Sequence, residues 1–119
     1  MSQLYFLQMN MKKAFVASVE LARRCAEVDG EVVCLVTEPY RYKGKVCSIP
    51  RGFKSIASSD GPRAAIYWRG NFEILKLEQF CGQDCAVGIT RIGKNNMILV
   101  SGYLDINKSV IPDLSLIHI

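Results

Sequence analysis

The first thirty residues contain two different patterns of apolar positions. Residues 4–9 are mostly apolar and end in Asn10, a residue common at strand ends and helix caps, so they predict a buried strand. Apolar positions then recur at helical spacing, the charged positions fall largely elsewhere, and Gly30 supplies a stop. This pattern predicts an amphipathic helix of about four turns. The side chains expected on its apolar face are Phe15, Val19, Ala22 and Ala26.

A β-branched apolar run over residues 31–37, broken by Pro39, predicts a second strand. Because strand, helix and strand follow one another, the two strands are expected to be parallel neighbours. Beyond them, short apolar runs separated by Gly, Pro, Asn and Asp predict an antiparallel, β-rich half. Its expected strands are 45–49, 53–57, 63–69, 72–77, 85–92 and 97–104. Gly93, Asn95 and Asn96 indicate a hairpin turn between the last two.

Length and composition restrict the class of protein. The 119 residues are 50% hydrophobic and 22% charged, and 15 basic side chains against 11 acidic ones give a net charge of +4. This is a globular composition, long enough for one domain of roughly 100 to 150 residues or a piece of a larger one. No apolar run approaches the roughly 18 residues of a membrane span. Lys12 and Lys13 follow the first apolar run, the reverse of a signal peptide, so we expect an intracellular protein, nuclear or cytoplasmic, that is not secreted.

The sequence argues against several kinds of functional site. His118 is the only histidine and lies in the apolar segment 114–119, so a Ser/His or Cys/His nucleophilic site is disfavoured. Neither a Walker-type nor a dinucleotide-binding glycine pattern occurs. The odd number of five cysteines argues against a disulfide framework. Cys81 and Cys85 lack a second Cys or His pair nearby, which favours a loop or core role over zinc binding.

Two polar residues stand at the ends of the first two predicted strands. Asn10 follows the first strand and Glu38 follows the second. Parallel strands present their functional groups at the carboxyl edge, so these side chains are expected to lie side by side. A carboxylate with a neutral amide suits Mg²⁺, which takes few protein oxygens and keeps waters and substrate phosphate. The alternative is that Asn10 caps the helix and Glu38 is a solvated loop acid.

Residues 40–69 carry a local excess of positive charge. Their seven basic side chains face a single acid, Asp60, and aromatic residues are interleaved with them. This pattern is typical of a surface that follows a phosphate backbone and stacks on bases or sugars. The alternative is a solvated basic face with core aromatics. The basic residues are Arg41, Lys43, Lys45, Arg51, Lys54, Arg63 and Arg69.

Five short motifs resemble the endonuclease/exonuclease/phosphatase superfamily, and within it the apurinic-like endonuclease domain of non-LTR retrotransposon polyproteins. The order and spacing of the motifs carry the resemblance over most of the chain. The motifs are Leu7-Gln8-Met9-Asn10, Leu35-Val36-Thr37-Glu38-Pro39-Tyr40, Lys43-Gly44-Lys45 leading to Ile49-Pro50, Pro62-Arg63-Ala64-Ala65-Ile66-Tyr67, and Val100-Ser101-Gly102-Tyr103. Thr37 departs from the family, which usually has glutamine at this position.

The resemblance implies a metal-dependent phosphodiester hydrolase that nicks DNA to prime a downstream reverse transcriptase domain of the same polyprotein. Asn10 matches the active-site asparagine, Glu38 the metal-binding glutamate and Tyr103 the active-site tyrosine. Mg²⁺, or Mn²⁺, is the expected cofactor, with Glu38 and Asn10 as its ligands. DNA is the expected partner, contacted by the basic residues Arg41, Lys43, Lys45 and Arg63.

The implied fold is α/β (α+β): part of a four-layer sandwich with a mixed, mostly antiparallel sheet and a flanking helix. Residues 1–113 are expected to form the N-terminal part of this domain, and residues 114–119 a tail that looks appended. The family's Gly-Asp-x-Asn and Ser-Asp-His segments have no counterpart before Ile119, so this polypeptide is expected to be inactive. Two alternatives stay open: a non-catalytic nucleic-acid-binding module, or another phosphodiesterase of the superfamily, acting on abasic DNA, RNA tails or a phospholipid head group.

Overall fold

The first three elements form a strand–helix–strand unit. The computed structural model describes residues 4–58 and 61–103. Strand β1 (Leu4–Asn10) leads into helix α1 (Phe15–Glu27) and strand β2 (Glu31–Thr37). β1 and β2 pair in parallel along their whole length. The predicted strands, their parallel pairing and the helix between them are therefore confirmed. The expected burial of the first strand is wrong: none of its residues is fully buried and Phe6 is 40% exposed, because β1 is an edge strand that pairs only with β2 among the described strands.

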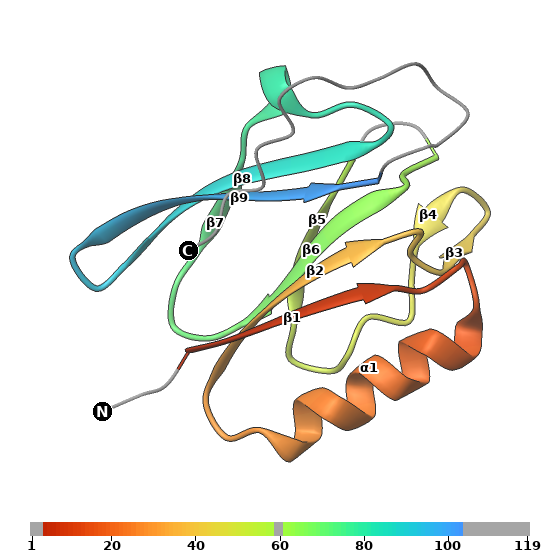
Figure 1. Cartoon of the computed structure of the whole chain (residues 1–119), viewed down its shortest axis with the longest axis horizontal. Helices are drawn as coiled ribbons and strands as arrows, with labels where there is room; N and C mark the ends of the chain where they lie inside the picture. The colour runs from red at the N-terminus through yellow and green to blue at the C-terminus, as the bar shows by residue number, and fades with distance from the viewer. Residues whose placement is uncertain (1–3, 59–60, 104–119) are drawn as a thin grey trace.

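The remaining strands complete two sheets (Figure 1). The first has the order β1-β2-β6-β5, in which β5 (Lys54–Ala57) and β6 (Ala64–Arg69) join by antiparallel pairing. The second is the antiparallel sheet β7-β8-β9, formed by β7 (Ile74–Lys76), β8 (Cys85–Ile92) and β9 (Asn95–Gly102). A 3-10 turn, η1 (Glu78–Phe80), connects β7 to β8. The predicted β-rich, antiparallel half is confirmed.

Two local expectations need correction. The strand expected over 45–49 is only Lys45–Val46 (β4), which forms a small hairpin with Arg41–Tyr42 (β3). Positive φ angles at Lys43 and Gly44 make the tight turn that brings these strands together. In the later hairpin, Ile92 pairs with Asn95, so the turn is Gly93-Lys94 and both asparagines lie in β9.

The two central strands of the first sheet, β2 and β6, are buried on both faces because α1 covers one face and the second sheet covers the other (Figure 1). β6 shows this with the period of two that strands impose. Ala65 and Tyr67 pack with α1 and β2, while Ala64, Ile66 and Trp68 pack with the second sheet. The described residues therefore form an α/β sandwich of helix, sheet and sheet, with mostly antiparallel strands, as predicted.

The buried face of α1 differs from the predicted one. Ser18, Leu21 and Cys25 are buried, whereas the side chains of Phe15 and Val19 are each 53% exposed. The two faces have the same helical spacing but are displaced by one residue, which is about 100° around the axis. Both faces follow the helical period, so the spacing alone cannot choose between them. Packing against the sheet buries the face that contains Leu21.

In the described residues, no helix is long and apolar enough to cross a membrane. Leu104, expected at the end of the last strand, and the expected tail at 114–119 lie outside those residues.

Candidate active site

Asn10 and Glu38 lie next to each other at the carboxyl ends of β1 and β2. The parallel register places Asn10 opposite Thr37, one residue before Glu38. The side-chain amide of Asn10 donates a hydrogen bond from Nδ2 to Oε1 of Glu38, at 3.3 Å. The expectation that the two side chains meet at this edge is confirmed.

The backbone around this pair turns sharply. Lys12, Lys13 and Glu38 have φ angles of 50°, 60° and 46°, in the left-handed region that non-glycine residues seldom adopt. The Lys13 N–H donates to the Glu38 carbonyl at 2.9 Å, and the Lys12 N–H donates to Oδ1 of Asn10 at 2.8 Å. Helix α1 begins after Ala14, without a side-chain cap. Asn10 therefore organises the loop and the carboxylate and does not cap the helix.

The donor groups at this edge fit a hard divalent cation. Glu38 offers a partly exposed carboxylate, and Mg²⁺ is often held by one or two carboxylates while it keeps several waters. The oxygen of Asn10 already accepts from Lys12, and its nitrogen points to Glu38. Glu38 could therefore hold a metal directly, and Asn10 orients it while its oxygen retains a second lone pair for the same metal. Among the described residues, no three His, Cys, Asp or Glu side chains gather as a metal cluster.

Arg63 and Tyr103 extend the edge from Glu38 to the second sheet. The Glu38 N–H donates to the carbonyl of Arg63 at 2.8 Å. The Arg63 guanidinium carbon lies 5.5 Å from the centre of the Tyr103 ring, and its Nη1 lies 3.5 Å from Oδ1 of Asp84. The Tyr103 N–H in turn donates to the Asp84 carbonyl at 2.7 Å. A continuous set of contacts therefore joins Asn10 and Glu38 to Tyr103.

The basic residues predicted to contact nucleic acid occupy two places. Lys43 and Lys45 are exposed on the β3–β4 hairpin, beyond the carboxyl ends of β1 and β2 (Figure 1), and the Lys43 ammonium lies 5.4 Å from the centre of the Tyr42 ring. Arg41 turns toward the loop before Arg63, since its Nη1 lies 3.1 Å from where a Cβ on Gly61 would be. Arg41 thus lies against the loop that leads to Arg63, whereas the two lysines are on the exposed hairpin.

Two other basic residues of the same segment have structural roles. The Arg69 guanidinium donates to the carbonyls of Cys25, Val28 and Gly30 at 2.8–3.1 Å, which ties the end of α1 to β6. Lys54 forms an exposed ion pair with Glu73. The composition of residues 40–69 therefore overstates the charge available to a ligand.

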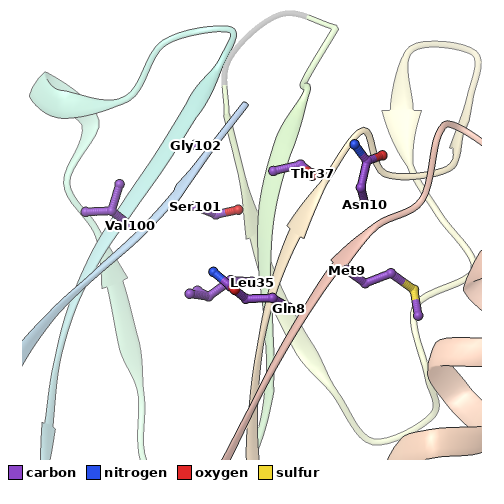
Figure 2. A pocket seen from close by; sticks show the side chains of 8 residues that line it. All are labelled: Gln8, Met9, Asn10, Leu35, Thr37, Val100, Ser101 and Gly102. Carbon is purple, nitrogen blue, oxygen red and sulfur yellow. The ribbon is translucent and has the colours of Figure 1, made fainter. Parts of the chain in front are cut away.

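A cavity of about 270 Å³ adjoins Asn10 between the two sheets (Figure 2). Residues of β1 and β2 line one side and residues of β9 the other. Ser101 stands on the β9 side, and its hydroxyl donates to the Val36 carbonyl at 2.8 Å. The lining residues are Gln8, Met9, Asn10, Leu35, Thr37, Val100, Ser101 and Gly102.

Sequence reasoning missed the polar residues that join the two sheets here. Besides Ser101, the buried Ser58 hydroxyl donates to the Gln83 carbonyl at 2.7 Å, and Asp84 contacts both Arg63 and Tyr103. A serine inside an otherwise apolar strand, such as Ser101, can indicate from the sequence a hydrogen bond between two sheets. Nothing in the sequence pattern marks Asp84.

Two of the cysteines, Cys25 and Cys34, belong to the core between α1 and the first sheet. The sulfurs of the buried Cys25 and Cys34 are 3.7 Å apart and not bonded. The hydrogen bond from Cys34 lowers the pKa of Cys25 and raises the pKa of Cys34 itself. Cys81 accepts the Val87 N–H at 3.3 Å, in agreement with a loop or core role.

Comparison with known proteins gives a similarity in fold. No known family model matches the sequence, and no curated protein matches it. Among solved structures, the chain is similar to the endonuclease domain of TRAS1, a telomere-specific non-LTR retrotransposon, with a TM-score of 0.70 and 25% identity. The match covers 87% of this chain and 45% of that one, so the chain spans less than half of the solved structure. In fold, this chain therefore matches the endonuclease domain of a non-LTR retrotransposon, as its motifs indicated.

Proposed function

We propose that this chain is part of a metal-dependent endonuclease domain that nicks DNA in a non-LTR retrotransposon polyprotein. The adjacency of Asn10 and Glu38, at 3.3 Å on the carboxyl edge of two parallel strands, carries the proposal. The similarity to the TRAS1 endonuclease domain supports an endonuclease-type function. DNA is the proposed substrate, and a downstream reverse transcriptase domain, which would extend the nicked 3′ end, is the proposed partner.

The residues have distinct roles in this proposal. Glu38 holds Mg²⁺ or Mn²⁺, and Asn10 orients the carboxylate. The metal, when bound, polarises the phosphodiester and offsets the charge that develops as water attacks in line. Tyr103 donates its hydroxyl proton in a hydrogen bond to the phosphate. Arg41, Lys43, Lys45 and Arg63 supply the positive charge that attracts the DNA backbone.

Metal binding tests the central role of Glu38. Titration with Mn²⁺ is expected to broaden the NMR signals of the Glu38 N–H and the Asn10 side-chain amide, because a paramagnetic ion at the carboxylate relaxes nearby nuclei. Glu38→Gln should weaken this effect about tenfold or more, since it removes the charged ligand. Glu27→Gln, at the opposite end of α1, is the matched control and should leave it unchanged. Broadening at this edge that survives Glu38→Gln would contradict the metal site.

The 119-residue polypeptide alone is expected not to nick DNA efficiently. The resemblance assigns water activation to Asp, Asn and His groups in segments that these 119 residues do not contain. Supercoiled plasmid incubated with the protein and Mg²⁺ should therefore remain supercoiled, as resolved on an agarose gel. Nicked circles that appear with the wild type and disappear with Glu38→Gln would contradict this expectation.

A second candidate is a nucleic-acid-binding module without catalysis. An exposed aromatic ring beside a basic group favours it: Tyr42 is 56% exposed and the Lys43 ammonium lies 5.4 Å from the centre of its ring. In this case DNA affinity should fall steeply with salt, survive Glu38→Ala, and drop when Arg41 and Lys43 are replaced. Affinity that requires both Glu38 and a divalent metal would favour the endonuclease instead.

A further inference from the structure

We infer that Arg63, held by Asp84, is a positioning residue that orients Tyr103 and links it to the backbone of Glu38. The inference rests on the proposed function, because it assigns Tyr103 and Glu38 to one phosphodiester site. Neither Asp84 nor its pairing with Arg63 was apparent from the motifs. The consequence is that DNA binding at this edge depends on an acidic residue that has the same charge sign as the phosphate.

Three contacts link Arg63, Asp84 and Tyr103 to one another. The Arg63 guanidinium lies over the Tyr103 ring at 5.5 Å, Asp84 pairs with that guanidinium at 3.5 Å, and the Asp84 carbonyl accepts the Tyr103 N–H at 2.7 Å. The ring and the backbone of Tyr103 are thus held by two residues that also hold each other. Tyr103 lies one residue beyond the end of β9, and its N–H bond to Asp84 continues the β8–β9 register by one position, so the contact with Arg63 is what acts on the ring itself.

The backbone of Arg63 connects these three residues to Glu38, the proposed metal ligand. Its carbonyl accepts the Glu38 N–H at 2.8 Å, and its N–H donates to the Gln83 carbonyl at 2.9 Å. Arg63 therefore bridges the end of β2 and the residues that precede β8. A change in the position of Arg63 would move Tyr103 through its side chain and Glu38 through its backbone.

Burial and side-chain chemistry make this pairing more than a loose surface contact. The Arg63 and Asp84 side chains are only 27% and 23% exposed, so solvent screens their attraction less than it would in an exposed pair. A guanidinium can lie over an aromatic ring and form an ion pair with a carboxylate at the same time, because it is planar and its charge is delocalised. A lysine would retain the charge of Arg63 but not this geometry.

The alternative is that Arg63 acts only as a cation that attracts phosphate. The two roles predict opposite effects for Asp84→Asn. Removal of a negative charge beside a phosphate-binding cation should strengthen DNA binding. Loss of the anchor for a positioning arginine should weaken it, because Tyr103 is no longer placed.

The test combines a spectroscopic readout with an affinity. The ring signals of ¹³C-labelled tyrosines are recorded for the wild type, Asp84→Asn and Arg63→Lys, with Tyr103→Phe to assign Tyr103. We expect the Tyr103 signals to shift in both variants while those of Tyr42 stay. Glu73→Gln is the control, because it removes one negative charge from an ion pair with Lys54 near the other end of β8. It should shift the signals of neither Tyr103 nor Tyr42. Thermal unfolding of each variant shows that it is folded.

The affinity for a short DNA duplex with Mg²⁺ is measured by fluorescence anisotropy for the same variants. Asp84→Asn is expected to weaken binding about fivefold, and the Asp84→Asn/Tyr103→Phe double variant to bind no worse than Tyr103→Phe alone. Unchanged Tyr103 signals, or tighter DNA binding by Asp84→Asn, would overturn the inference. A wild-type chain that does not bind the duplex would refute the proposed function, and the Tyr103 signals would still decide whether Arg63 and Asp84 position the ring.

Discussion

Tyr67 shows how a single side chain can suit the core and still contain a poorly placed group. The residue is 1% exposed, and its hydroxyl has no hydrogen-bond partner among the described residues. Burial raises the pKa of this phenol, because the ionised form would lose its hydration. The apolar ring therefore stabilises the fold, while the hydroxyl makes it dependent on pH.

We expect Tyr67→Phe to raise the free energy of unfolding at pH 7 by about 1 kcal/mol, since it removes an unpaired buried hydroxyl. Above pH 10 the unfolded chain releases the phenolic proton and the folded chain retains it. Stability of the wild type should consequently fall, by about 1.4 kcal/mol per pH unit from this group. Urea unfolding from pH 7 to 11 measures both effects. Tyr42→Phe, at an exposed tyrosine, should keep the alkaline loss, and a Tyr67→Phe variant that also keeps it would contradict the assignment.

At the residue scale, identical residue types also divide by environment. Arg63 and Arg69 both belong to the basic, aromatic segment of residues 40–69. Arg69 satisfies carbonyls at the end of α1, and Arg63 lies at the candidate site with Asp84 and Tyr103. The two arginines are equivalent in the composition of the chain. Only the fold shows that Arg63, and not Arg69, can face a ligand.

At the scale of elements, α1 illustrates what periodicity can and cannot determine. The helical spacing correctly predicted the helix, but it selected the face of Phe15 and Val19, which is half exposed. The buried face is displaced by one position and contains a serine, Ser18, whose hydroxyl donates to the Phe15 carbonyl at 2.6 Å. An internal hydrogen bond of this kind lets a polar residue enter the core.

Substitutions on the two faces should have unequal effects. Leu21→Ala is expected to lower the free energy of unfolding by about 3 kcal/mol, because it leaves a cavity between α1 and β2. Val19→Ala should change it by less than about 0.5 kcal/mol, since that side chain is half exposed. Urea denaturation of both variants measures the difference. Equal losses would show that the Val19 face is covered in solution.

At the scale of the whole molecule, the close packing of the two sheets depends on Gly88 in the middle of β8. A Cβ at this position would lie 2.4 Å from Cγ2 of Ile74 and 2.9 Å from Cδ1 of Ile56. Ile56 belongs to the first sheet and Ile74 to the second, so a side chain here would press on both. The glycine therefore sets how closely the sheets approach, and with it the relative positions of Glu38 and Tyr103.

We expect Gly88→Ala to lower the free energy of unfolding by about 2 kcal/mol through this overlap. Gly82→Ala is the matched control, because a Cβ there meets nothing within 4 Å and the change should stay within about 0.5 kcal/mol. Thermal or urea unfolding distinguishes the two. If Gly88→Ala were as stable as the control, the sheets would pack less closely than described.

Prediction from the sequence succeeded where the cause is local. The strands at 4–10, 31–37 and 85–92 follow from apolar runs and their punctuation, and the parallel pair follows from strand, helix and strand order. Parallel pairing then sufficed to bring Asn10 and Glu38 together, because both terminate their strands. The β3–β4 hairpin was missed because it consists of two residue pairs and depends on the left-handed Lys43-Gly44 turn.

The sequence by itself therefore determined the elements, the parallel edge and the Asn10–Glu38 pair. Each of these depends on contacts between near neighbours or on chain order, which are written directly in the residues. Only the tertiary structure decided which face of α1 is buried, which arginine supports the helix, and that Asp84 joins Arg63 to Tyr103. The contacts of the two arginines and of Asp84 join residues 19 to 44 positions apart, and their geometry exists only when the helix and the two sheets have packed together.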